Sequence, residues 1–316
     1  MLNNFLITIT LLAQVSGLTL PQILLEDDFY LAPNFTVDNE LKLEVEPLNK
    51  IPTEKGAPVK ITDENGPDSL GAFSAIAVDR NTEKILWEKN ADTVNPIASI
   101  TKLMTALVFL DHNPSWDHKH KISPQENYLI GARLNASNDE EFSTFNLFRT
   151  ALVGSRNNAA MALAHSTEMS DDNFTKLMND KAVMLSMKDS SFVEPTGLEA
   201  GNKSSVKDLV KLAKAAFSRD VIVGPMQMAT HEMKREGSDE VITIKNTNKL
   251  IKEGYSKIVA GKTGYTEEAG FCFLSLAENE WGDEIIVAVL GVPDDDQRFW
   301  EAKEIIDWVF NNYKWN

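Results

Sequence analysis

The chain has 316 residues, a formal net charge of −16 and one cysteine, Cys272. Its length can bury a large core and suggests one or two domains. The acidic balance argues against nucleic-acid binding, because no basic surface would neutralise phosphates, and it leaves no basic patch for anionic lipids. The single cysteine excludes an intrachain disulfide and is expected to pack in an apolar strand.

The N-terminus carries a short apolar run at residues 5–15, followed by Ser16-Gly17. This run is too short to span a bilayer but has the length of a signal-peptide core. Residues 1–4 lack the lysine or arginine that usually precedes such a core. We predict that residues 1–17 are a signal peptide of an exported protein. A retained weak membrane anchor and a misassigned start are the alternatives.

Residues 18–70 differ in composition from the rest. The first 70 residues hold 11 acids against 4 bases, and half of the chain's 12 prolines. Such a segment is typical of an extended, self-repelling linker. The alternation at 41–45 would instead suit one edge strand docked on the domain. We predict an acidic, proline-rich linker at 18–70 and a folded domain at 71–316.

The remaining chain has an α+β pattern. Strands are predicted at 73–78 and 84–87, with a hairpin turn between them. Helical periodicity follows at 147–163, 173–187 and 206–217. Strands return at 257–260, 271–276 and 284–290, before a last helix at 297–312. Because strands at both ends enclose a helical middle, we expect one sheet completed from the two ends.

Ser99-Ile-Thr-Lys102 places a hydroxyl and an amine on one helical face. A lysine made neutral by burial can take the proton of the serine, so no histidine is required. The apolar pattern at 97–110 predicts that burial. A second match, Ser204-Ser-Val-Lys207, lies in a polar stretch and is interpreted as a helix cap. Ser99 is therefore the candidate nucleophile.

Two further motifs follow, Ser155-Arg-Asn157 and Lys262-Thr-Gly264. Sets of S-x-x-K, S-D-N and K-T-G mark penicillin-binding proteins and class A β-lactamases. The stretches around them, at 75–106, 192–208 and 246–270, closely resemble the D-alanyl-D-alanine carboxypeptidase family, the low-molecular-weight penicillin-binding proteins. The resemblance extends from about residue 73 to the C-terminus.

The resemblance implies a β-lactamase/transpeptidase-like fold, an antiparallel sheet flanked by helices with a helical subdomain. It also implies a serine-type carboxypeptidase that acts on peptidoglycan stem peptides ending in D-Ala-D-Ala, outside the cytoplasm. β-Lactam antibiotics are expected ligands, and neither a cofactor nor a metal is expected. The short form also resembles members that cleave cross-links as D,D-endopeptidases.

Reacting groups can be assigned from the resemblance. Ser99 would attack the carbonyl between two D-alanines, with Lys102 as the proton acceptor. The counterpart of Ser155 in the family relays the proton to the leaving amine. The counterpart of Asn157 orients the lysine and the substrate amide.

The third motif is expected to bind the substrate. Lys262 and Thr263 would hold its terminal carboxylate, and Gly264 would allow an extended peptide to approach the strand. The backbone N–H groups of Ser99 and Tyr265 would form the oxyanion hole. Arg298 would either assist with the carboxylate or be an exposed arginine at a helix start.

Some features depart from the family or invite another interpretation. Arg156 replaces a small residue, and either tunes the site or points outward. Asn158 stands where aspartate is common. His118-Lys-His120 has no nearby cysteine or spaced His-Glu set to complete a metal site, so we interpret it as a solvated loop.

Two other functions share these motifs. A β-lactamase would need a dedicated base for rapid deacylation, for which Glu194 is the available loop carboxylate. A non-catalytic cell-wall binding protein would result if Arg156 obstructed the cleft.

Overall fold

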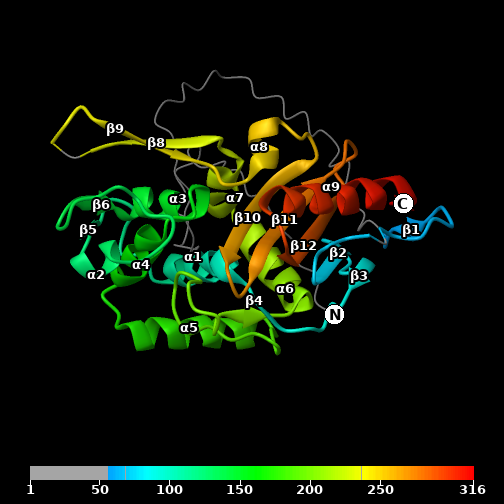
Figure 1. The fold of residues 1–316 in the computed structure, drawn as a ribbon, viewed down its shortest axis with the longest axis horizontal. Helices are drawn as coiled ribbons and strands as arrows, with labels where there is room; N and C mark the ends of the chain where they lie inside the picture. Colours follow the sequence, from blue (N-terminus) through cyan, green and yellow to red (C-terminus); the bar gives the residue numbers. More distant parts are fainter. Residues whose placement is uncertain (1–55, 68, 236) are drawn as a thin grey trace, which may run out of the picture. The chain divides into compact units, whose positions relative to one another are not determined.

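The structure, a computed structural model, describes residues 56–316 except 68 and 236 (Figure 1). The predicted signal peptide at 1–17, most of the predicted linker and the alternating stretch at 41–45 lie outside the described residues. Within the described part, no helix combines the length and apolar character needed to cross a bilayer.

A five-stranded antiparallel sheet organises the fold (Figure 1). Its strands, in spatial order, are β10 (Ile258–Thr266), β11 (Gly270–Glu278), β12 (Glu284–Val292), β2 (Ser74–Asp79) and β3 (Ile85–Lys89). Ala77 of β2 lies opposite Val287 of β12. Strands from early and late in the chain therefore share one sheet, which confirms the prediction and the α+β class.

The two faces of this sheet are covered by different helices. Successive side chains of a strand point to opposite faces. Ala77 packs in a cluster with α9 (Asp295–Asn312) on one face. Ile76 packs on the other face, in a cluster that includes α1 (Thr101–Asp111) and α6 (Val206–Phe217).

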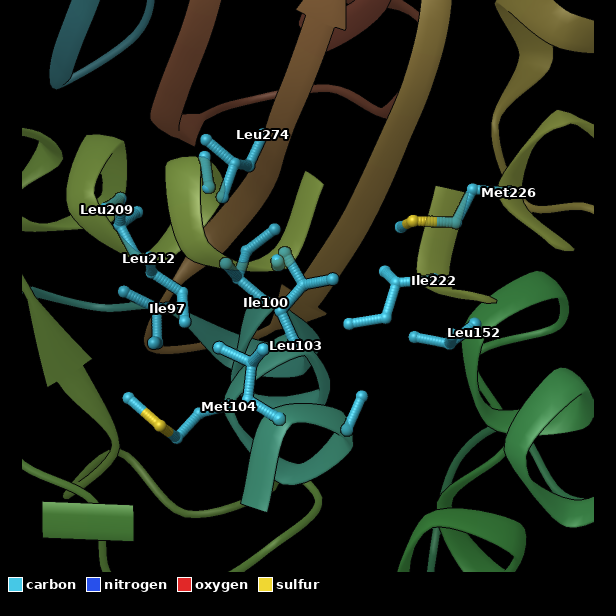
Figure 2. Packing of buried hydrophobic residues seen from close by; sticks show 14 of the residues in the cluster. Ile97, Ile100, Leu103, Met104, Leu152, Leu209, Leu212, Ile222, Met226 and Leu274 are labelled. Carbon is cyan, nitrogen blue, oxygen red and sulfur yellow. The ribbon is translucent and has the colours of Figure 1, made fainter. Parts of the chain in front are cut away.

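The cluster that contains Ile76 also includes α1, the helix that begins within the first motif. Figure 2 shows Leu103 and Met104 of α1 near Leu209 and Leu212 of α6 and Leu274 of β11. All five side chains are fully buried. Each such leucine contributes about 1.5–3 kcal/mol, so the position of α1 against the sheet is strongly held.

The helical subdomain carries the middle motif. The predicted helix at 147–163 is wrong, because the chain forms two helices, α3 (Thr144–Val153) and α4 (Asn157–His165). The break falls at Ser155, whose φ of 54° is left-handed and cannot continue a right-handed helix. The prediction at 173–187 corresponds to α5 (Asp171–Met184), and that at 206–217 to α6.

Several short elements were not predicted. They are η1 (Ala98–Ile100), α2 (Pro124–Asn127), α7 (Asp220–Gln227), α8 (Lys249–Glu253), the hairpin of β5 (Lys119–Lys121) and β6 (Glu141–Ser143), the hairpin of β8 (Thr230–Lys234) and β9 (Val241–Lys245), and the pair of β4 (Asn95–Pro96) and β7 (Lys203–Ser204). In β8 only His231 and Met233 are buried, so its apolar alternation is weak.

Residues before the predicted boundary at 71 already pair with the folded domain. β1 (Val59–Lys60), which falls in the predicted linker, pairs with β13 (Tyr313–Lys314). The backbone N–H of Ile61 extends this contact to the carbonyl of Asn312, at 2.8 Å. The last residues of the chain thus hold the start of the described part.

Candidate active site

Ser99 lies in η1, immediately before α1. Ile97, Ile100 and Leu103 surround it in sequence and are completely buried, which anchors this turn in the core. Ser99 itself is half-buried, so its hydroxyl is accessible. The Nζ of Lys102, one helical turn further on, lies 2.7 Å from Ser99 Oγ, as the spacing of the two residues predicts.

The amine of Lys102 is buried, with two further partners. It donates to Asn157 Oδ1 at 2.8 Å and to the carbonyl oxygen of Thr196 at 2.6 Å. Burial lowers the pKa of Lys102 to about 7, although the Glu194 carboxylate opposes this shift. The oxygens of Asn157 and Thr196 can only accept hydrogen bonds. A neutral Lys102 amine therefore donates its two N–H groups to them and directs its lone pair towards Ser99.

The loop that supplies the Thr196 carbonyl was not singled out as part of the site. Its organiser is Glu194, whose carboxylate accepts from the backbone N–H groups of Thr196 at 2.5 Å, Gly197 at 2.6 Å and Leu198 at 2.8 Å. Gly197 has φ +83°, and a Cβ there would lie 2.0 Å from the carbonyl oxygen of Ala98. The Pro195-Thr-Gly-Leu198 stretch, within the family-like segment at 192–208, is the sequence feature from which this loop could have been predicted.

Ser155 faces the third motif. Lys262 Nζ donates to Ser155 Oγ at 2.6 Å and to the carbonyl oxygen of Thr263 at 2.9 Å. Lys262 is completely buried, and its pKa lies well below the usual value because of burial and the nearby Lys102 and Arg298 cations. The first and second motifs are themselves joined by the Lys102 to Asn157 hydrogen bond, so all three motifs converge.

The K-T-G motif lies within β10, which extends to Thr266 and beyond the predicted strand at 257–260. β10 is an edge strand of the five-stranded sheet, and among the described residues only β11 pairs with it. A Cβ on Gly264 would lie 2.9 Å from the carbonyl oxygen of Ile97. Gly264 therefore allows the edge strand to approach the turn that carries Ser99.

Two neighbours position the side chains of β10. Thr263 Oγ1 lies 2.6 Å from Thr247 Oγ1, a contact that the sequence analysis did not anticipate. The Tyr265 ring is half-exposed and stacks on Phe271, with ring centroids 4.2 Å apart. The Tyr265 ring thus lies at the solvent-accessible C-terminal end of β10.

Arg298 is buried, so of the two alternatives given for it the exposed arginine at a helix start is wrong. Its Nη1 donates to the carbonyl oxygen of Gly264 at 2.9 Å, and its Nη2 pairs with Asp295. The guanidinium also packs over the Phe299 ring, 4.8 Å from the centroid. The arginine is buried because backbone carbonyls and a carboxylate replace water around it. It supports the K-T-G strand through the backbone.

Comparison with known proteins identifies the fold and the family. The sequence profile of peptidase family S11, the D-alanyl-D-alanine carboxypeptidases, matches residues 61–294. The chain belongs to this family. Among solved structures, the Streptomyces K15 DD-transpeptidase is 26% identical, with a TM-score of 0.74 over 78% of this chain and all of that one. Penicillin-binding protein D2 of Listeria monocytogenes, in its cefotaxime-bound form, is 28% identical with a TM-score of 0.70 and the same coverage.

Curated relatives in the D-alanyl-D-alanine carboxypeptidase family carry two names. The D-alanyl-D-alanine endopeptidase of Escherichia coli is 36% identical over 65% of this chain. The carboxypeptidase DacF of Bacillus subtilis is 30% identical over 77% of this chain. The matched part spans 66% and 63% of these two relatives, about two thirds of their length.

The two departures from the family pattern behave differently in this S11 member. Arg156 is half-buried, so it does not simply point outward, and its Nε is buried with no hydrogen-bond partner among the described residues. Burial lowers its pKa. Asn158 is completely buried and binds both backbone groups of Leu134, with Oδ1 accepting from its N–H at 2.7 Å and Nδ2 donating to its carbonyl at 2.9 Å. Asn158 therefore anchors the loop between α2 and β6.

Proposed function

We propose that this chain is a serine-type D-Ala-D-Ala carboxypeptidase that acts on peptidoglycan stem peptides through an acyl-enzyme on Ser99. One observation carries the proposal, the buried amine of Lys102 held 2.7 Å from the Ser99 hydroxyl. A buried lysine with a lowered pKa is a general base of the kind that activates a serine without histidine. Membership of the family supports the choice of reaction.

Acylation would begin when Lys102 takes the Ser99 proton and Oγ attacks the carbonyl carbon between the two D-alanines. The backbone N–H groups of Ser99 and Tyr265 would then stabilise the oxyanion, a contribution of about 3–4 kcal/mol for a donor in such a hole. Ser155, bonded to Lys262 at 2.6 Å, is suited to pass a proton to the leaving amine. The released product is D-alanine, and water then hydrolyses the ester.

The substrate would bind along β10. An edge strand offers free backbone groups to an extended peptide, which aligns the scissile bond by strand addition. We assign the terminal carboxylate of the substrate to Lys262 and Thr263, and the orientation of its amide to Asn157. Arg298 acts as a positioning residue. Its Nη1 donates to the Gly264 carbonyl oxygen, and its Nη2 pairs with Asp295.

A β-lactamase activity is disfavoured by the state of Glu194. Its carboxylate accepts from three successive backbone N–H groups and from Asn202 Nδ2 at 2.6 Å. A carboxylate saturated in this way is a loop organiser, with no free lone pair to activate a deacylating water. The acyl-enzyme formed with a penicillin should therefore persist.

Cleavage of cross-links is the second candidate function. It is favoured by the identities of 34–36% with three D-alanyl-D-alanine endopeptidases, against 30% or less with the carboxypeptidases among the relatives compared. Both reactions use the same acyl-enzyme and differ in the leaving amine. The active site chemistry is common to the two.

Penicillin labelling tests the nucleophile. Mass spectrometry of a penicillin-treated digest should find the adduct on Ser99, and Ser99→Ala should abolish it. The matched control is Ser204→Ala, in the chance match to the motif, which should retain full labelling. An adduct on another serine would refute the assignment, rapid loss of label would indicate a β-lactamase, and no adduct would indicate a binding protein.

Two substrates then separate the peptidases. Release of D-alanine from a pentapeptide ending in D-Ala-D-Ala would indicate a carboxypeptidase. Cleavage of cross-linked dimers without that release would indicate an endopeptidase. Because peptidoglycan lies outside the cytoplasmic membrane, we also propose that the chain is exported, with residues 1–17 as the signal peptide. N-terminal sequencing of the exported protein tests that cleavage.

A further inference from the structure

A second group of polar side chains gathers away from the candidate active site. His120 of β5, Glu126 of α2 and His165, the last residue of α4, place one ligand atom each within 4.8 Å of one another. Glu126 Oε1 lies 2.8 Å from His120 Nε2 and 2.6 Å from His165 Nδ1. The interpretation of His118-Lys-His120 as a solvated loop is therefore wrong for His120, because this residue lies in β5 and its largely buried ring contacts Glu126, six residues further along the chain.

We propose that His120, Glu126 and His165 form a binding site for a divalent transition-metal cation, with Zn²⁺ the best match. Two imidazole nitrogens and one carboxylate oxygen are a ligand set that zinc accepts, with water in the fourth position. The Glu126 side chain is completely buried, whereas the two histidines are 18% and 29% exposed. The exposed histidines give the cation a route in and leave space for the water.

The contacts around the three ligands would suit a metal site, in which a cation takes the place of the His165 proton that lies against Glu126. His165 Nε2 lies 2.8 Å from Asp171 Oδ1, and Glu126 Oε2 accepts from the Ser123 backbone N–H at 2.7 Å. Metal-bound histidines usually donate their other N–H to a carboxylate, which fixes the ring and its tautomer. With its Nε2 proton donated to Asp171, His165 would offer its Nδ1 lone pair to the cation once Nδ1 gives up the proton that it donates to Glu126 Oε1, so zinc and this proton compete for the site.

A cation at this position would join three parts of the helical subdomain. It would tie the β5 and β6 hairpin and α2 to the C-terminal end of α4. The same helix begins at Asn157, whose Oδ1 accepts from Lys102. The proposed metal is thus structural, and it would hold the helix that brings the middle motif to Ser99.

Zinc binding to the whole protein tests the proposal. After removal of metals with EDTA, isothermal titration with ZnCl₂ in a non-chelating buffer should show one Zn²⁺ per chain and a rise in melting temperature. His120→Gln and His165→Gln should each weaken binding by more than about tenfold, and Asp171→Asn by roughly 10–100-fold. His112→Gln is the matched control, because His112 is exposed and outside the group. Co²⁺ in place of Zn²⁺ should give the visible absorption of a tetrahedral site.

Folding of the variants is checked independently by circular dichroism. Absence of stoichiometric Zn²⁺ binding to the unaltered protein would overturn the proposal without any variant. Binding that both histidine variants leave unchanged would overturn it equally. In either case the group is a hydrogen-bonded cluster that serves only to pack the subdomain.

Discussion

The pH dependence of acylation follows from the environment of Lys102. With its pKa lowered to about 7, roughly half of the amine is neutral at pH 7, about a tenth at pH 6 and about a hundredth at pH 5. A lysine with the ordinary pKa of 10.5 would be only about 0.03% neutral at pH 7. Burial therefore raises the fraction of active base by about three orders of magnitude. Because the neutral form is the base, the rate should rise with pH and level off above about 7.

The measurement is the rate constant for acylation by a fluorescent penicillin, followed by stopped flow between about pH 5 and 9 at constant ionic strength. Lys102→Ala should lower the plateau by about 10²–10⁴-fold, the usual contribution of a general base. Lys207→Ala, in the chance match to the motif, should leave the profile unchanged. A rate that is flat between pH 5 and 8, or a Lys102→Ala variant within tenfold of the unaltered protein, would refute the reasoning.

Three further substitutions test the supports of the site. Arg298→Ala should lower the free energy of unfolding by about 1–3 kcal/mol, measured with urea, because the buried carbonyl of Gly264 loses its donor. Gly264→Ala should lower the free energy of unfolding by about 1–3 kcal/mol and slow acylation by more than about tenfold, because the Cβ of the new alanine would press on the Ile97 carbonyl oxygen. Gly224→Ala, with nothing within 4 Å of the new Cβ, is the control and should leave acylation unchanged. Arg156→Gly should change the acylation rate by less than about tenfold, about 1.4 kcal/mol, because Arg156 Nε has no hydrogen-bond partner among the described residues; a larger gain in a labelling time course would mean that Arg156 restrains the site.

Local geometry explains what could be predicted from the sequence. The spacing of Ser99 and Lys102 implies their contact, because residues three apart on a helix are neighbours. The strongly apolar strands β11 and β12 were expected within two residues of their observed bounds. Burial of Lys102 followed from the apolar pattern around it. These inferences depend on near neighbours in the chain.

Features that depend on distant contacts escaped prediction. The break at Ser155 requires a left-handed residue that is not glycine, and its hydroxyl contacts Lys262 from another part of the chain. Arg298 is buried only because β10 and β11 bring carbonyl groups to it. His165, which completes the group with His120 and Glu126, lies on α4, far from both in sequence. Helical and strand periodicities contain no information about such long-range pairs.

The pairing of β2 with β12 also constrains the order in which the protein can be assembled. β2 and β3 are made long before β12, so the hairpin that they form must wait for its neighbouring strand. Contacts this distant in sequence are slow to form and leave unpaired strand edges exposed meanwhile. A nascent chain that stops before residue 258 would contain η1 and α1, which carry Ser99 and Lys102, but would lack the edge strand β10. Ser99 and Lys102 therefore lack the strand proposed to bind the substrate until the last fifth of the chain has been made.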